Sequence, residues 1–256
     1  MKKFCQFALA VAGAVFISSG VASAQWGDLK MKFVIDGTAP KMAPLKVDKD
    51  PAVCGKKPLL EESFVVGKDG AVQDVVVYLV PKGTVKIHPS YDEAKDAEVV
   101  IDNKNCMFVP HIALLRVGQS LVCKNSDPVG HNSQVNFAIN TPQNPSLPPG
   151  GSIVFKAADI AKAEKRATSV KCSIHPWMQA WLVVQDHPYM AASDEAGLVE
   201  IKNLPVGKHS FQFWQERDGY PALSGGKLKL VKGKSDIEIK EGANDLGDIK
   251  IKPKAE

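Results

Sequence analysis

Three soft metal ligands lie within one short segment in the second half of the chain. In the run Cys-Ser-Ile-His-Pro-Trp-Met at residues 172–178, Cys172, His175 and Met178 offer a thiolate, an imidazole and a thioether. Such a set favours copper, particularly where the thioether is only a weak axial ligand. The segment falls between two predicted strands, at 168–171 and 180–186, so its donors are expected to share one tight loop.

A fourth ligand has to come from another part of the chain, and His131 is the strongest candidate. It lies in the segment 125–132, also a predicted loop between two strands. A Cys-x-x-His pair is weak evidence alone, because zinc sites use such pairs together with two further nitrogen or sulfur ligands. Taken singly, Cys172 could be half of a disulfide and His175 a surface residue. Their combination with Met178 and His131 favours a metal centre.

Strand patterns dominate the chain and define the elements that would hold these ligands. Short apolar or alternating runs, bounded by Gly, Pro, Asn or Asp, are typical of a β-sandwich or barrel, so the predicted fold class is all-β. A helix is expected only at residues 157–166, and the proline-rich segment 141–152 is expected to be an irregular loop. In the first two thirds of the chain, strands are also predicted at 29–35, 74–80, 112–117, 120–125, 133–139 and 152–156.

The pattern becomes more regular after Asp186, where strands with one polar face are expected. They indicate a second, smaller β-sandwich. We therefore expect a first domain over residues 25–187 and a second over 188–256, with the N-terminal residues 25–100 adding strands to the first. The strands predicted in the second domain are 198–201, 210–214, 227–230, 236–239 and 248–251.

Residues 106–139 and 170–186 together resemble the cupredoxins, the blue-copper fold of plastocyanin, pseudoazurin and amicyanin. The resemblance implies a Greek-key β-sandwich that holds one copper ion cycling between copper(I) and copper(II). Its motifs are Met-Phe-Val-Pro at 107–110, Gly-Gln-Ser at 118–120, Asn125, His131-Asn132 and the loop Cys172-x-x-His175-x-x-Met178, which is as short as that of amicyanin.

The resemblance also implies a role for each residue of the centre. His131, Cys172 and His175 would form the trigonal plane around copper, and Met178 would be the long axial ligand. Asn132 would hydrogen-bond across to the ligand loop and stiffen it. Trp177 would lie beside a partly exposed edge of His175, on the surface that meets a redox partner protein. The chain departs from the family at Cys123 and Val170, where aromatic residues are usual.

Four cysteines follow the N-terminal segment, and an even number in an oxidising compartment suggests two disulfides. With Cys172 assigned to copper by the resemblance and Cys123 in a core strand, Cys54 and Cys106 become the expected pair. The disulfide would close a loop of about 50 residues, which would stabilise the fold by roughly 4 kcal/mol in the chain-entropy model. The alternative pair, Cys123–Cys172, would destroy the copper site.

The N-terminal residues 1–24 have the order of a secretory signal peptide. Two lysines precede an apolar run, and small residues end in Ala22-Ser23-Ala24. Cleavage after Ala24 would export the protein, to the periplasm or beyond, and lower the formal net charge from +4 to +2. Charges of both signs are interspersed along the chain, which argues against nucleic-acid binding. No later segment is apolar enough to predict a membrane span.

The C-terminal region carries a second resemblance. The runs Asp194–Gly197, Asn203–Gly207 and Phe213-Trp214 are similar to a carboxypeptidase regulatory-like β-sandwich. The whole arrangement resembles exported proteins described as methylamine-utilisation-like, in which such a sandwich follows a cupredoxin domain. That likeness implies little about a substrate.

Three functions fit a single copper centre. The leading one is an electron carrier whose partner is another redox protein. The second is copper handling, as a carrier or store without a redox cycle. The third, a copper enzyme, would need further histidine-rich sites with His-x-His patterns, and the chain contains none, so we expect no enzyme. A second metal site that uses His111 and His187, both beside prolines, is a further possibility.

Overall fold

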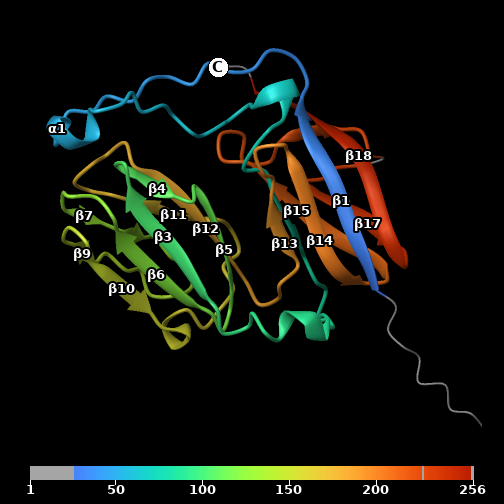
Figure 1. Cartoon of the computed structure of the whole chain (residues 1–256). Helices are drawn as coiled ribbons and strands as arrows, with labels where there is room; N and C mark the ends of the chain where they lie inside the picture. The colour runs from blue at the N-terminus through green and yellow to red at the C-terminus, as the bar shows by residue number, and fades with distance from the viewer. Residues whose placement is uncertain (1–25, 227, 255–256) are drawn as a thin grey trace, which may run out of the picture.

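The computed structural model describes residues 26–226 and 228–254, which form two β-sandwiches placed side by side (Figure 1). The predicted signal peptide, residues 1–24, lies outside the described residues. In the described ranges no helix is long and apolar enough to cross a membrane. The all-β prediction is confirmed, because the helical elements described are single short turns: α1 (Pro51–Cys54), η1 (Lys68–Gly70), η2 (Pro89–Tyr91) and η3 (Ala157–Asp159).

The first sandwich contains the predicted ligand loop. One sheet has the order β10-β6-β3-β4 and the other β5-β12-β11-β8, while β7 and β9 pair with each other at one end. Alternate residues of both sheets meet in one core, among them Leu121 of β6 and Leu182 of β12. The strands are β3 (Glu98–Lys104), β4 (Met107–Val109), β5 (Ile112–Arg116), β6 (Ser120–Asn125), β7 (His131–Asn132), β8 (Gln134–Val135), β9 (Ser146–Leu147), β10 (Ser152–Phe155), β11 (Thr168–Lys171) and β12 (Gln179–Gln185).

The second sandwich is assembled from both ends of the chain. Its sheets have the orders β14-β1-β18-β16 and β13-β2-β15-β17. Phe33 of β1 and Phe213 of β15 meet in its core, with ring centroids 6.4 Å apart. The strands are β1 (Trp26–Ile35), β2 (Val76–Leu79), β13 (Met190–Ala192), β14 (Leu198–Pro205), β15 (Gly207–Trp214), β16 (Ala222–Ser224), β17 (Lys234–Ile239) and β18 (Gly242–Lys252).

The structure places β1 and β2 in the second sandwich, not in the first, where the sequence led us to expect them. β1 pairs with β14 on one side and with β18 on the other, and β2 pairs with β13 and β15. The apolar residues Leu29, Met31 and Phe33 of β1 are fully buried there. Residues 188–256 alone would therefore lack a central strand of each sheet.

The two sandwiches share an apolar boundary. Val76 and Tyr78 on the outer face of β2 pack with Ile112 of β5 and Val183 of β12. Burial of these side chains on both sides favours a fixed arrangement of the two sandwiches over independent motion.

Residues 43–61, which we call the strap, leave the second sandwich and reach across to the first. Its two arms are joined by backbone hydrogen bonds from Leu45 N to Leu59 O and from Glu61 N to Ala43 O. The strap carries α1 at its tip, beside the first sandwich (Figure 1). The buried Cys54 of α1 belongs to the core of the first sandwich.

Three local predictions differ from the structure. Only Gln134–Val135 of the segment 133–139 is a strand. Residues 228–230 are not a strand, and residue 227 lies outside the described residues. The helix predicted over 157–166 is reduced to the single turn η3. Tertiary contacts hold the remaining residues of that segment in a non-helical conformation. The buried Glu164 accepts hydrogen bonds from the backbone N–H groups of residues 138–140 with its side chain.

Substitution of Gly197, which lies beside β1 in the second sandwich, tests the position of β1. Gly197 has φ +75°, and a Cβ built there would collide with the carbonyl oxygen of Phe33. We expect Gly197→Ala to lower the free energy of unfolding by about 2 kcal/mol, because it combines a left-handed backbone with this clash. Chemical denaturation measures the change. Gly83→Ala, with nothing within 4 Å of the added Cβ, is the control. Equal stability of both variants would contradict the pairing of β1 with β14.

Candidate metal centre

The ligand loop joins β11 to β12 and is closed by its own hydrogen bonds. The backbone N–H of Met178 donates to the carbonyl of His175 at 2.9 Å, and that of Cys172 donates to the carbonyl of Met178 at 3.4 Å. The backbone N–H of His175 points at the sulfur of Cys172, 3.4 Å away. The loop is thus folded back on Cys172 in the structure.

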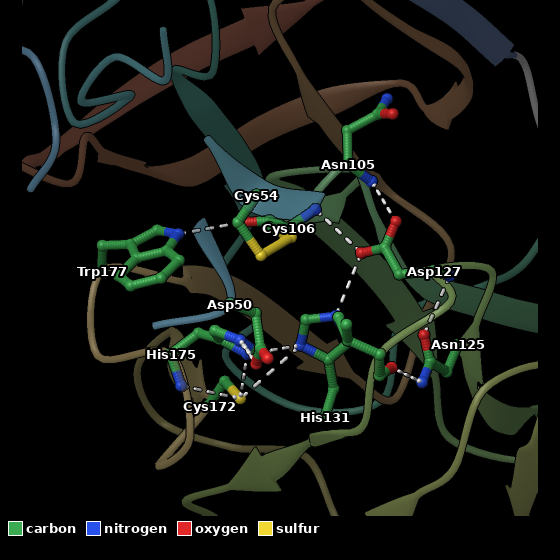
Figure 2. Close-up of a disulfide and its surroundings, with 11 residues drawn as sticks. Asp50, Cys54, Asn105, Cys106, Asn125, Asp127, His131, Cys172, His175 and Trp177 are labelled. Carbon is green, nitrogen blue, oxygen red and sulfur yellow. Dashed lines mark hydrogen bonds and ion pairs between the residues drawn. A yellow bond between two sulfur atoms is a disulfide. The ribbon is translucent and has the colours of Figure 1, made fainter. Parts of the chain in front are cut away.

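Three donor atoms from this loop and from β7 converge in a buried space. The Nδ1 atoms of His131 and His175 are 2.9 Å apart, and each is 3.8 Å from the Sγ atom of Cys172. His131, Cys172 and His175 are at most 3% exposed. Figure 2 shows the three side chains pointing toward one another. The structure therefore brings together three of the four predicted ligands.

The far nitrogens of the two rings are held by carboxylates. Nε2 of His131 lies 3.0 Å from the carboxylate of Asp127, and Nε2 of His175 lies 2.9 Å from that of Asp50. Because an ionised carboxylate only accepts hydrogen bonds, each Nε2 carries the proton in a neutral ring. Both Nδ1 atoms are then left with a lone pair that faces the other and the Cys172 sulfur. Two nitrogen lone pairs and a sulfur that converge in this way are suited to bind one cation.

The charge state of His131 agrees with this assignment. Burial lowers the pKa of His131, and the neighbouring His175 lowers it further, although the hydrogen bond to Asp127 acts in the opposite direction. The neutral ring that results is the form that binds metal ions.

The spacing of the donors fits one ion. Typical bonds of about 2.0 Å to imidazole nitrogen and about 2.3 Å to thiolate sulfur, taken from zinc sites, span separations up to about 4.3 Å between two ligands of one ion. The observed separations of 2.9 and 3.8 Å lie within that limit. Met178, the predicted axial ligand, is 1% exposed and belongs to the core beside the loop.

A second group of potential ligands in the described residues shares His131. It comprises Cys106, Asp127 and His131. Cys106 is bonded to Cys54 in the predicted disulfide, with an S–S distance of 2.01 Å, so its sulfur is not free to bind a metal. Cys123 and Cys172 are unpaired, which excludes the alternative Cys123–Cys172 bridge in this structure.

Asn132 connects the two halves of the site. Its side-chain oxygen accepts a hydrogen bond of 2.8 Å from the backbone N–H of Ser173 and one of 3.4 Å from the Cys172 thiol. Its amide nitrogen donates to Asn144 at 2.6 Å. The hydrogen bond expected between Asn132 and the ligand loop is therefore present, and it fixes the loop relative to β7.

Comparisons with known proteins found similarity to solved structures over part of the chain. No model of a known protein family matches the chain, and a search of curated proteins found no match. Among solved structures, a purple cupredoxin from Nitrosopumilus maritimus is 25% identical, with 35% of this chain and 99% of that chain covered and a TM-score of 0.27. A reduced tryptophan-to-tyrosine mutant of amicyanin is 17% identical, with 35% and 83% covered and a TM-score of 0.29.

A copper-containing nitrite reductase from Thermus scotoductus is also similar to part of the chain. It is 20% identical, with 41% of this chain covered and a TM-score of 0.29. The match extends over 25% of the reductase chain.

The expectation of a partly exposed edge on His175 is wrong. His175 has no exposed surface, because Asp50 on the strap meets its Nε2 atom and Trp177 packs beside its ring at a centroid distance of 5.1 Å. Trp177 itself is partly exposed, and its indole N–H donates to the carbonyl of Cys106 at 3.0 Å. The neighbouring Ile174 is 42% exposed.

The two carboxylates of the site were not among the residues predicted from the sequence. Asp127 lies four residues before His131, in the loop between β6 and β7, so a search for a carboxylate near a ligand histidine could have found it. Asp50 lies 125 residues from His175, and no local pattern signals their contact.

His111 and His187 do not share a site. Nε2 of His187 donates to the carbonyl of Leu79 at 3.0 Å, and the ring is fully buried. His111 contacts two acids instead: its Nε2 atom lies 2.5 Å from Glu216, and its Nδ1 atom lies 3.4 Å from Glu62. A second metal site built from both histidines is therefore contradicted. His111, directly before β5, thus forms ion pairs with Glu216, which follows β15 of the second sandwich, and with Glu62, which follows the strap.

This ion pair predicts a pH-dependent contribution to stability. Burial alone would lower the pKa of His111, but the hydrogen bond to Glu216 and the nearby carboxylate of Glu62 outweigh it and raise the pKa to about 10. An imidazole in the unfolded chain has a pKa of about 6.5. Because the folded pKa is the higher one, the stabilisation is complete below pH 6.5 or so and is lost as the pH rises toward about 10.

We expect His111→Gln to reduce the free energy of unfolding by about 2 kcal/mol near pH 6. The difference from wild type should shrink as the pH rises. Urea unfolding at several pH values measures it, and His209→Gln, whose ring bonds only a backbone carbonyl in the described residues, is the control. A difference in unfolding free energy between wild type and His111→Gln that grows with pH would contradict an ion pair of charged His111 with the two glutamates.

Proposed function

We propose that the protein binds one copper ion through His131, Cys172, His175 and Met178. The observation that carries this proposal is the convergence of two imidazole Nδ1 atoms on a buried cysteine sulfur, with both Nε2 atoms already hydrogen-bonded to carboxylates. Two imidazoles, a thiolate and a thioether are the soft donors that suit copper, and a buried methionine at the end of the loop supplies the last of them.

We propose further that the protein is an electron carrier. Bound copper would supply a one-electron couple. The residues contribute a rigid and dry environment: Asn132 fixes the loop, Asp127 and Asp50 orient the rings, and the core side chains exclude water. A ligand set held in place in this way needs little rearrangement when its charge changes, which favours rapid electron exchange.

The proposed location is outside the cytoplasm. The predicted signal peptide at residues 1–24 would direct export, and the disulfide between Cys54 and Cys106 is the kind of bond that persists in an oxidising compartment such as the periplasm. The proposed partner is another redox protein. The exposed Ile174 and Pro176, beside Trp177 on the ligand loop, offer it an apolar contact surface.

A redox titration of the copper-loaded protein tests the electron-carrier proposal. We expect one electron per chain, a reversible midpoint, and unchanged copper content after repeated cycles of reduction and reoxidation. Release of copper in either state would favour copper handling instead, since a carrier or store exchanges its ion. Mass spectrometry of the native protein after each cycle measures retention.

A further inference from the structure

We propose that Asp50 is a positioning residue for His175, and that it reaches the ring only because the Cys54–Cys106 disulfide anchors the strap. The inference rests on the proposed copper function, since it concerns how a ligand is held. It assigns a role to a segment that is remote in sequence from the ligand loop. The disulfide would thus help to orient a metal ligand, in addition to stabilising the fold.

The contact between the strap and the ligand is direct. The Oδ2 atom of Asp50 lies 2.9 Å from Nε2 of His175, whose side chain has no exposed surface, whereas the side chain of Asp50 is 44% exposed. The carboxylate therefore separates the ring from solvent. By accepting the Nε2 proton it also fixes the tautomer that turns the Nδ1 lone pair toward His131 and Cys172.

One helical turn connects Asp50 to the disulfide and fixes its position. The backbone N–H groups of Val53 and Cys54 both donate to the carbonyl of Asp50, each at 2.9 Å. Asp50 is the N-cap of α1 and has φ 45° and ψ 45°, a left-handed conformation that Asp and Asn adopt more readily than most residues. Cys54 is in turn bonded to Cys106 beside the site.

The other histidine is supported without the strap. The carboxylate of Asp127 accepts hydrogen bonds from the backbone N–H groups of Asn105 and Cys106, at 2.7 and 2.8 Å, as well as lying 3.0 Å from Nε2 of His131. All of these residues belong to the first sandwich and its loops. Figure 2 shows Asp127 beside His131 and Asp50 beside His175.

This asymmetry gives a specific expectation. Removal of the disulfide frees the strap and with it Asp50, but it leaves Asp127 attached to the backbone at 105–106. The support of His175 should therefore be lost while that of His131 remains. A disulfide that only stabilised the fold would affect both histidines alike.

The test begins with copper-free protein. Acylation of each histidine by diethyl pyrocarbonate, followed by peptide mass spectrometry, measures how well each ring is protected. Asp50→Ala and the double variant Cys54→Ala with Cys106→Ala should raise the reaction rate of His175 at least about tenfold, with that of His131 nearly unchanged. Asp50→Asn, which tolerates the left-handed backbone and keeps an acceptor oxygen, should stay close to wild type. Asp48→Asn, an exposed acid of the same strap, is the control.

The copper-loaded forms give the second measurement. We expect transfer of copper to a chelator to be about tenfold faster for Asp50→Ala and for the double variant than for wild type, Asp50→Asn or Asp48→Asn. Equal reactivity of His175 in wild type and Asp50→Ala would overturn the positioning role. Equal reactivity in wild type and the double variant would overturn the anchoring by the disulfide. A wild type that binds no copper would overturn the proposed function, while the copper-free measurement would still decide the role of Asp50.

Discussion

Replacing Cys172 by serine is expected to abolish the intense visible absorption of the copper-loaded protein. That band would arise from charge transfer between the cysteine thiolate and copper. The serine hydroxyl is a hard donor that remains protonated near neutral pH, so it cannot supply the same soft, covalent bond. The two histidines and Asn132 would stay in place, because their hydrogen bonds to Asp127, Asp50 and the backbone of Ser173 do not involve the Cys172 sulfur. Absorption spectroscopy of the loaded variant measures the result.

The other free cysteine among the described residues provides a matched control. Cys123 is also fully buried, and burial raises the pKa of its thiol to about 12, so it is a poor source of thiolate. Cys123→Ala should leave the band intact and lower only the stability, by about 1–2 kcal/mol for a small cavity. A band that survives Cys172→Ser, or disappears in Cys123→Ala while the protein stays folded, would show that the wrong thiolate has been assigned.

Replacing Met178 by leucine is expected to raise the reduction potential of the centre. The thioether donates weakly to copper(II), and a hydrocarbon of similar volume cannot, so the oxidised state loses stabilisation while the core stays filled. We expect a rise on the order of 100 mV, which corresponds to about 2.3 kcal/mol at 59 mV per tenfold change in the equilibrium constant. Potentiometric titration measures it.

Met107 serves as the control for that experiment. It lies in β4, is partly buried, and is not among the proposed ligands. Met107→Leu should leave the potential within a few tens of millivolts of wild type, since it changes packing and no ligand. A potential that is the same in Met178→Leu and wild type would mean that Met178 does not coordinate copper.

The regular strands were predictable because local apolar patterns determine them. β6 and β11 have the predicted bounds, and β12 is shifted by one residue at each end. The donors in the loop between β11 and β12 were found for the same reason: three of them lie within seven residues of sequence. The soft chemistry of those residue types then favoured a metal centre before any geometry was known.

Long-range pairing was not predictable from such patterns. The alternation in β1 shows that one face is buried, but not which sheet buries it; its partners β14 and β18 begin more than 160 residues away. Asp50 was missed for a similar reason, because its contact with His175 depends on the path of the strap and on the disulfide. The predicted helix at 157–166 failed where Glu164 bonds the backbone of a neighbouring loop, an interaction that propensity does not include.

The most direct test of the copper centre is a titration of residues 25–256 with copper(II), followed by visible absorption and by metal analysis of the desalted protein. We predict an intense band that grows linearly, reaches its maximum at one copper per chain, and disappears reversibly on reduction without loss of copper. Tight binding of copper without such a band would contradict coordination by the Cys172 thiolate, and so would a band that first saturates at two ions per chain.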